Sequence, residues 1–290
     1  MSFANAWGHR PAVIPEGCDE FVLPHCMMGV EVEMEFFGNH DSVIDDIRRL
    51  LYWSRVNEGS LRNGTEIVLG QPLMGKQLRD ALVEMSEVLH NNRRVDFNFR
   101  TSVHVHMDIR DLSHEELHNL VVLYTIWERT FFRNLFPERE NNAYCIPWYK
   151  RCPQRETIAA IKENMPSMFG ETDRYLSLNL RAVRDRGSVE FRAHSGTADY
   201  QSLVDWINIL MSLKARAIEE TDEDYFYKVS NEGPEQVAYD LFGERLGSKF
   251  DTMHLHSDLI EGARTAQFLI LPEMPVYPGP VEVSTVEKFI

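Results

Sequence analysis

The sequence predicts an α+β domain built on an antiparallel sheet, with helices packed on the apolar face of that sheet. Three short stretches, residues 29–37, 102–109 and 187–194, alternate apolar with polar residues, which is typical of strands with one buried face. Longer stretches between and after them carry apolar residues at helical spacing. Strands interspersed with helices, with a hairpin late in the chain, favour the α+β class.

Composition limits the function classes. The chain has 290 residues, enough for one large domain or two ordinary ones, and 43% of them are hydrophobic. Its net charge of −15 argues against broad electrostatic binding to nucleic acid or to an anionic membrane. We find no apolar run of transmembrane length and no N-terminal signal pattern, and the four cysteines are irregularly spaced. We therefore expect a soluble cytoplasmic protein with reduced thiols.

The elements of the first half follow from local patterns. We expect, in order, an arm over residues 1–26, a strand over 29–37, a helix over 41–56, a strand over 65–69 and a helix over 78–89. Pro11, Pro15 and Pro24 interrupt any periodicity in the arm. Gly70 and Pro72 close the strand at 65–69.

The second half begins with the histidine-rich strand over 102–109. A long helix should start at Ser113, because Ser113 and Glu116 make a capping box. We then expect an irregular functional loop over 137–153, a hairpin of 175–183 with 188–193, a helix over 201–217, and a Pro-rich tail over 271–290. Periodicity between the last helix and the tail is weak.

Polar residues should share one face of the sheet. Side chains alternate between the two faces of a strand, so this face receives Glu31, Glu33, Glu35, His104, His106, Asp108, Glu190 and Arg192. Carboxylates about 6.5–7 Å apart along a strand can converge on two cations about 3.5–4 Å apart. Like charges about 7 Å apart repel by roughly 2 kcal/mol at an effective dielectric near 20, so an enclosed acidic face needs cations or raised pKa values.

The alternative is a strand face open to water, where the repulsion is much smaller and no cation is needed. The recurrence of the pattern in three segments favours the enclosed site. Mixed carboxylate and imidazole ligands suit Mg²⁺ or Mn²⁺ better than a cysteine-rich zinc site would.

Six motifs occur in a fixed order over roughly residues 28–215. They are Gly29-x-Glu31-x-Glu33, Glu58-Gly59-Ser60, Glu66-Ile67-Val68 with Pro72-Leu73, His104-Val105-His106, Asn179-Leu180, and Glu190-Phe191-Arg192. This ordered set resembles the putative amidoligase family of carboxylate–amine ligases, relatives of glutamine synthetase and glutamate–cysteine ligase. The family has Asp-Gly-Ser where this chain has Glu58-Gly59-Ser60, which puts the substrate-facing turn in doubt.

The resemblance implies a glutamine-synthetase-like curved sheet within a catalytic domain over residues 27–270. It also implies ATP and Mg²⁺ (or Mn²⁺) as cofactors. A small-molecule or peptide carboxylate would receive the terminal phosphoryl group, and an amine would displace phosphate from the acyl phosphate to give an amide or isopeptide bond. The loop over 137–153 and the turn near Glu58 would then set substrate selectivity.

Roles for single residues follow from the same resemblance. The metal ligands would be Glu31, Glu33, Glu66, His104 and Glu190. Arg192 would stabilise charge on the transferring phosphoryl group, with Glu66 and Glu190 as its catalytic partners. Cofactor binding would fall to His106, Asn179, Arg181 and Arg186. The arginines fit a solvated basic turn equally well.

Two alternative functions stay open. A two-metal hydrolase would need the same glutamates and histidines, although the arginines favour phosphoryl chemistry. A catalytically inactive binding module would bind neither nucleotide nor metal. The sequence leaves the acid, the amine and the oligomeric state open.

Overall fold

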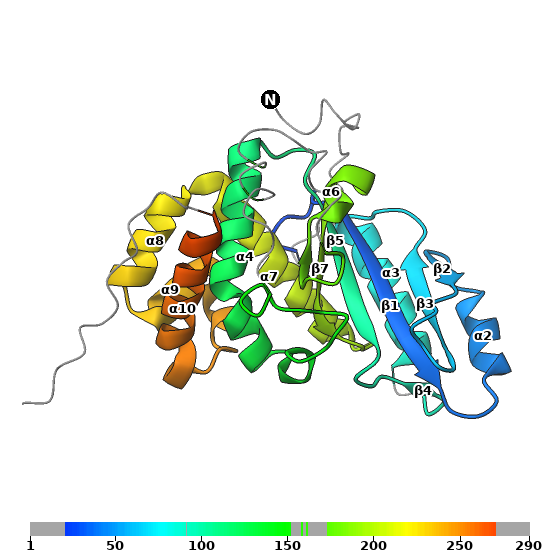
Figure 1. Cartoon of the computed structure of the whole chain (residues 1–290). Helices are drawn as coiled ribbons and strands as arrows, with labels where there is room; N and C mark the ends of the chain where they lie inside the picture. Colours follow the sequence, from blue (N-terminus) through cyan, green and yellow to red (C-terminus); the bar gives the residue numbers. More distant parts are fainter. Residues whose placement is uncertain (1–20, 91, 152–157, 159–160, 162–172, 271–290) are drawn as a thin grey trace, which may run out of the picture.

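The computed structural model describes residues 21–90, 92–151, 158, 161 and 173–270. Within these ranges the chain forms one seven-stranded antiparallel sheet and eight α-helices. Figure 1 shows how they are arranged. The predicted α+β class is therefore confirmed. The expected tail over 271–290 and most of the expected arm over 1–26 lie outside the described residues.

The sheet is built mainly from the predicted strands. Its members are β1 (Met28–Phe36), β2 (Trp53–Val56), β3 (Gly64–Leu69), β4 (Val95–Asp96), β5 (Ser102–Asp108), β6 (Leu178–Asn179) and β7 (Ser188–Ser195). Their order is β2-β3-β1-β5-β7-β6, and β4 pairs with the end of β1. The three strands with alternating sequences, β1, β5 and β7, therefore lie side by side in the middle of the sheet.

Eight α-helices and one 3₁₀ turn accompany the sheet in the described part of the chain. The bounds are α2 (Asp41–Ile47), α3 (Gly75–Leu89), α4 (His114–Asn134), α6 (Arg181–Arg186), α7 (Tyr200–Glu219), α8 (Asp222–Asn231), α9 (Pro234–Gly247) and α10 (Thr252–Ile270), with a 3₁₀ turn η1 at Pro137–Arg139. The predicted capping box at Ser113 and Glu116 is present at the start of α4. Figure 1 shows α8, α9 and α10 on the far side of α4 from the sheet.

The apolar face of the sheet packs against helices, as predicted. Val30, Val32 and Val105 are fully buried. On the same face, the rings of Phe191 on β7 and Tyr124 on α4 lie 5.2 Å apart. Near the opposite edge of the sheet, the indole N–H of Trp53 on β2 donates to the main-chain carbonyl of Ala81 on α3 at 2.9 Å. This face forms the main core.

The predicted helix over 41–56 is wrong in its second half. Helix α2 ends at Ile47, and Trp53–Val56 instead forms β2, paired with β3 at the edge of the sheet. Leu51, which continues the helical spacing of Ile44 and Ile47 and should be buried in a helix, is exposed. Pairing with β3 is a long-range interaction, so local spacing could not reveal it.

The predicted hairpin is also only partly correct. Asn179 does pair with Glu190, but the paired segment β6 has two residues, and Arg181–Arg186 forms the short helix α6 instead of a strand end. Gly187 ends this helix at φ +68°, a left-handed conformation that suits glycine.

Two segments extend the expectations, one near each end of the described chain. Helices α8 to α10 fill the region where periodicity was weak. The last residues of the expected arm are docked, because Phe21 and Cys26 are buried and the Val22 N–H donates to Asn208 Oδ1 at 2.9 Å. Among the described residues, no helix combines the length and the apolar character that crossing a membrane requires.

Candidate active site

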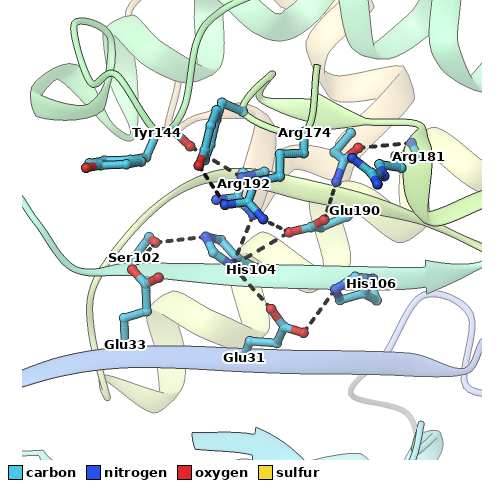
Figure 2. A network of polar contacts seen from close by, with 12 residues as sticks. Glu31, Glu33, Ser102, His104, His106, Tyr144, Arg174, Arg181, Glu190 and Arg192 are labelled. Carbon is cyan, nitrogen blue, oxygen red and sulfur yellow. Dashed lines mark hydrogen bonds and ion pairs between the residues drawn. The ribbon is translucent and has the colours of Figure 1, made fainter. Parts of the chain in front are cut away.

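Strand register brings the predicted polar residues together. Glu33 on β1 lies directly opposite Glu66 on β3, and Glu31 lies opposite His104 on β5. His106 in turn lies opposite Glu190 on β7, which is opposite Asn179 on β6. Directly opposite residues have Cβ atoms about 4.5–5.5 Å apart, close enough to interact. Five strands thus place polar side chains on one patch of the sheet, and Figure 2 shows the part of it that β1, β5 and β7 form. We call this patch the polar centre; it comprises Glu31, Glu33, Glu66, His104, His106, Glu190 and Arg192.

The polar centre is enclosed. Only 7% of Glu33, 8% of Glu66, 6% of Glu190 and 3% of His104 is exposed. A water-facing strand face is therefore excluded as an explanation of the alternating pattern. Buried carboxylates need hydrogen bonds, cations or protons to offset the lost hydration. The carboxylates Glu31, Glu66 and Glu190 differ in which of these they have.

Glu31 is balanced by cations and donors. Its carboxylate lies 3.3 Å from His104 Nδ1, 3.3 Å from His106 Nε2 and 3.1 Å from Arg186 Nη1. Burial alone would raise the pKa of Glu31, but the two histidines outweigh it and hold that pKa well below its ordinary value. Glu31 is therefore ionised throughout the physiological range.

Glu66 has the opposite environment. Burial, followed by the negative charges of Glu31 and Glu33, raises the pKa of Glu66 to about 8. Before any cation binds, this carboxyl group holds a proton at neutral pH. The like-charge repulsion expected from the sequence is therefore present. It raises the pKa of Glu66, whereas the pKa of Glu31 is lowered.

Glu190 is held between two partners. It accepts hydrogen bonds from Asn179 Nδ2 and from Arg192 Nη1, each at 2.5 Å. Burial would raise the pKa of Glu190, but the charges of His106 and Arg192 lower it overall. The Arg192 guanidinium also lies 3.5 Å from His104 Nδ1 and donates to the main-chain carbonyl of Tyr144 at 3.3 Å, as Figure 2 shows.

Two sets of side chains have the geometry to hold a divalent cation. The first is Glu31, His104 and Glu190, and the second is Glu33, Glu66 and His104; in each set the ligand atoms lie within 4.8 Å of one another. Carboxylate oxygen and imidazole nitrogen fit Mg²⁺ or Mn²⁺. All five predicted metal ligands therefore lie in one centre.

His104 belongs to both sets but can serve only one. Its Nδ1 faces Glu31 and Glu190, whereas its Nε2 lies 2.9 Å from the Ser102 hydroxyl, which donates to Glu33. A neutral imidazole has a single nitrogen lone pair available for a metal. Ser102 already engages Nε2, which leaves the Nδ1 lone pair for a metal, so the first set is the better use of His104, and Ser102 supports the imidazole from the opposite nitrogen.

A β-bulge shapes the edge of the polar centre. Between β5 and β7 the pairing shifts from Val105–Phe191 to Val103–His194, which inserts an extra residue on β7. As a result His194 lies on the apolar side, packed 4.5 Å from the Phe136 ring. Burial lowers the pKa of His194 to about 4. Simple alternation from Glu190 and Arg192 would have put this imidazole in the polar centre.

Two cavities open onto the polar centre. The polar cavity, about 580 Å³, contains all of the polar centre and is also lined by Glu58, Ser60, Arg139, Tyr144 and Arg174. The apolar-walled cavity, about 340 Å³, is lined by Val56, Val68, Leu69 and Pro72 beside Asp108 and Arg110. Glu31, Glu66, His106 and Arg186 line both cavities, so the two spaces meet at the candidate metal ligands.

The predicted cofactor-binding residues divide into two groups. His106, Asn179 and Arg186 line the polar cavity. Arg181 lies on α6 beside Asn179, whose Oδ1 accepts its main-chain N–H, but its guanidinium faces Asp185 at 3.9 Å. Arg181 is absent from the lining of both cavities as the described residues form them.

Sequence reasoning missed several residues that line the polar cavity, among them Arg139 and Arg174. Arg139 lies in the expected loop over 137–153 and is buried, whereas Arg174 lies outside that loop and is exposed; no local pattern reports that either residue faces the cavity. The signal available was the concentration of basic and aromatic residues over 137–153, which pointed to the right segment without naming Arg139.

Fold and site together define an α+β protein with a candidate divalent-cation centre on the polar face of its sheet. The family model for putative amidoligase enzymes matches residues 49–214, more than half of the chain, and the protein belongs to this family. No curated protein matches the chain. The matched range contains Glu66, His104, Glu190 and Arg192, whereas Glu31 and Glu33 precede it and join the site through the pairing of β1.

Proposed function

We propose that the protein is an ATP-dependent carboxylate–amine ligase acting through an acyl phosphate. The observation that carries the proposal is the enclosed polar centre, in which two candidate cation sets lie beside Arg192, whose side chain is 14% exposed. Its membership of a family of putative amidoligases supports the same reaction class. A glutamine-synthetase-like curvature of the sheet belongs to this proposal as well.

The two cavities suit different parts of the reactants. A nucleotide base and sugar fit the apolar-walled cavity, whose valine, leucine and proline walls offer nonpolar contact. Its phosphates would then extend past His106 and Arg186 into the polar centre. The acid and the amine would enter through the polar cavity from the opposite side.

The chemistry proceeds in two balanced steps. A carboxylate oxygen of the acid forms a bond to the terminal phosphorus, and the bond from that phosphorus to ADP breaks. The amine nitrogen then bonds to the acyl carbon, phosphate leaves, and the nitrogen loses a proton. Divalent cations, when bound, neutralise charge on the phosphoryl oxygens.

Residues of the chain supply positioning and charge. Arg192 holds its guanidinium at the polar centre through Glu190 and the Tyr144 carbonyl, so it is preorganised to stabilise the transferring phosphoryl group. Glu58 lines the polar cavity and is fixed by the Ser60 N–H at 2.9 Å. Outside both cation sets, its carboxylate is placed to attract the ammonium form of the amine and to accept the proton.

The test is a coupled assay with the full chain, Mg²⁺, ATP, and panels of acids and amines. A ligase forms one amide and one phosphate for each ADP released, and neither acid nor amine alone supports full ADP release. Amide hydrolysis that needs the metal but no nucleotide would instead identify a two-metal hydrolase. Absence of metal and nucleotide binding in calorimetry would identify an inactive binding module.

A further inference from the structure

Among the described residues, Arg139 is a buried cation without an anionic partner. The residue ends the 3₁₀ turn η1 and is only 1% exposed, yet it lines the polar cavity. Its Nη2 donates to the main-chain carbonyl of Arg192 at 3.3 Å, and its Nε has no hydrogen-bond partner. No carboxylate among the described residues lies within ion-pair distance of it. A buried charge of this kind is strongly unfavourable unless an anion reaches it.

The neighbours of Arg139 do not supply that anion. Glu138, on the same turn, is occupied by the Ser195 hydroxyl. The Cys145 thiol is beside Arg139, but burial raises the pKa of Cys145 to about 11, so this group is neutral at physiological pH. Glu190 is paired with Arg192. The other arginines facing the same cavity differ from Arg139: Arg186 pairs with Glu31, and Arg100 lies 3.4 Å from Glu35.

The position of Arg139 indicates where the missing anion belongs. Because it contacts the main chain of Arg192, it lies next to the phosphoryl-transfer end of the polar cavity but outside the candidate cation sets. Arg174 lines the same cavity with an exposed guanidinium, stacked 4.7 Å from the Tyr175 ring centre. Figure 2 shows Arg174 on the same side of the polar centre as Arg192 and Tyr144.

We propose that the acid substrate is a dicarboxylate: one carboxylate reacts at the polar centre, and the second is bound by Arg139. Arginine is suited to this role because its planar guanidinium can donate two parallel hydrogen bonds to a carboxylate. Arg174 attracts the same acid from the mouth of the cavity. The inference rests on the proposed function and adds the class of acid to it.

The experiment uses calorimetry on the full chain with Mg²⁺ and a non-hydrolysable ATP analogue. The probes are the α,ω-dicarboxylates from malonate to adipate, each compared with its monoamide, which keeps one carboxylate and the chain length. We expect at least one dicarboxylate to bind about tenfold or more tightly than its monoamide, because a charge-assisted pair is lost in the amide. Equal binding, or no binding of any dicarboxylate while the analogue binds, overturns the inference.

Variants identify the residue responsible. Arg139→Met should remove the preference for the dicarboxylate and leave the affinities for the monoamide and the ATP analogue within about twofold of wild type, and Arg139→Lys should restore part of the preference. Arg174→Met, at the exposed mouth, should reduce the preference less. An equal loss of affinity for all ligands would show that Arg139 has only a structural role. A selective loss of affinity for the analogue or for inorganic phosphate would make it a phosphate site. Either result contradicts the inference.

The outcomes separate this inference from the proposed function. If the analogue does not bind, the ligase proposal itself fails. If it binds and drives ADP release with an acid and an amine but no dicarboxylate is preferred, only the substrate class fails. If Arg139→Met does not fold, the wild-type and Arg139→Lys preferences decide the question.

Discussion

Two regions of the molecule bury carboxylates, and they do so in opposite ways. In the polar centre, Glu66 lies among other acids, whose charges add to burial and raise its pKa to about 8. On α4, Glu128 is fully buried, but it accepts hydrogen bonds from the Ser177 hydroxyl and the Tyr149 N–H. Burial raises the pKa of Glu128 to about 7, and these donors limit the rise.

The difference shows which region is built for a ligand. Glu128 accepts hydrogen bonds from two neutral donors, the Tyr149 N–H and the Ser177 hydroxyl. These bonds connect α4 to the loop at Tyr149 and to the segment before β6. Among the described residues, none donates a hydrogen bond to the Glu66 carboxyl group and several neighbours are acidic, so a proton or a cation is needed to offset its charge. A region that gains from added positive charge is a binding site, whereas a region satisfied internally is structural.

The largest expected effect is on turnover. Arg192→Met should lower ligase turnover by about 10³-fold or more, because a positioned arginine contributes on that order to phosphoryl transfer. The measurement is ADP release at saturating substrates, with Arg48→Met, an exposed ion-pair residue at the end of α2, as the matched control. Turnover close to wild type in Arg192→Met would remove the polar centre from the reaction.

The next effect concerns stability at Glu128. The unfolded chain ionises this carboxyl near its ordinary pKa of 4.5, but the folded protein does so only near 7. The contribution of Glu128 to folding stability is therefore complete below pH 4.5, falls as the pH rises, and levels off above pH 7, a loss of about 3 kcal/mol. Glu128→Gln should abolish this loss and be more stable than wild type at pH 8 but not at pH 5.

Denaturant unfolding at the two pH values measures the Glu128 effect. The control is Glu87→Gln, on the surface of α3. An equal pH dependence in wild type and Glu128→Gln would show that Glu128 is not the source of the slope.

A smaller effect should separate two arginines of α6. Arg186 contacts Glu31 at 3.1 Å and lines both cavities, whereas Arg181 faces Asp185. We expect Arg186→Met to weaken binding of a non-hydrolysable ATP analogue by about tenfold, since hydrogen bonds to charged groups contribute on that order. Arg181→Met should change it by less than about twofold. Equal effects would restore the sequence-based expectation that both bind the cofactor.

The smallest expected effect is the number of protons released when a cation binds. Because the pKa of Glu66 is about 8 without a cation, Mn²⁺ binding at pH 7 should release close to one proton, and the release should vanish well above pH 8. Calorimetry in buffers of different ionisation enthalpy reports this number. Glu66→Gln should bind Mn²⁺ more weakly and release no proton. Proton release that is unchanged in Glu66→Gln would assign it to another group.

The sequence predicted the polar centre well because local alternation carries the information. Glu31, Glu33, His104 and Glu190 each sit on a strand whose apolar partners define its two faces, so only the order of strands had to be supplied by the fold. Extending the same alternation to His194 would not work, because a single extra residue on β7 reverses the face of every residue beyond it.

Long-range interactions account for the other differences. Trp53–Val56 has the apolar spacing of a helix but forms an edge strand once β3 is available to pair with it. Arg139 could be placed in a functional segment but not recognised as a buried unpaired cation, because its burial depends on β7 and Cys145. Helices α8 to α10 are set by packing on α4 and α7 and left only a weak sequence pattern.

The central claim is that the polar centre binds divalent cations beside a nucleotide, and anomalous diffraction tests it most directly. Crystals grown with Mn²⁺ and ADP, measured at the manganese absorption edge, should show two peaks. One should lie among Glu31, His104 and Glu190, and the other beside Glu33 and Glu66, with the ADP phosphates in contact with both. Manganese bound elsewhere, or ADP bound away from these residues, would contradict the account.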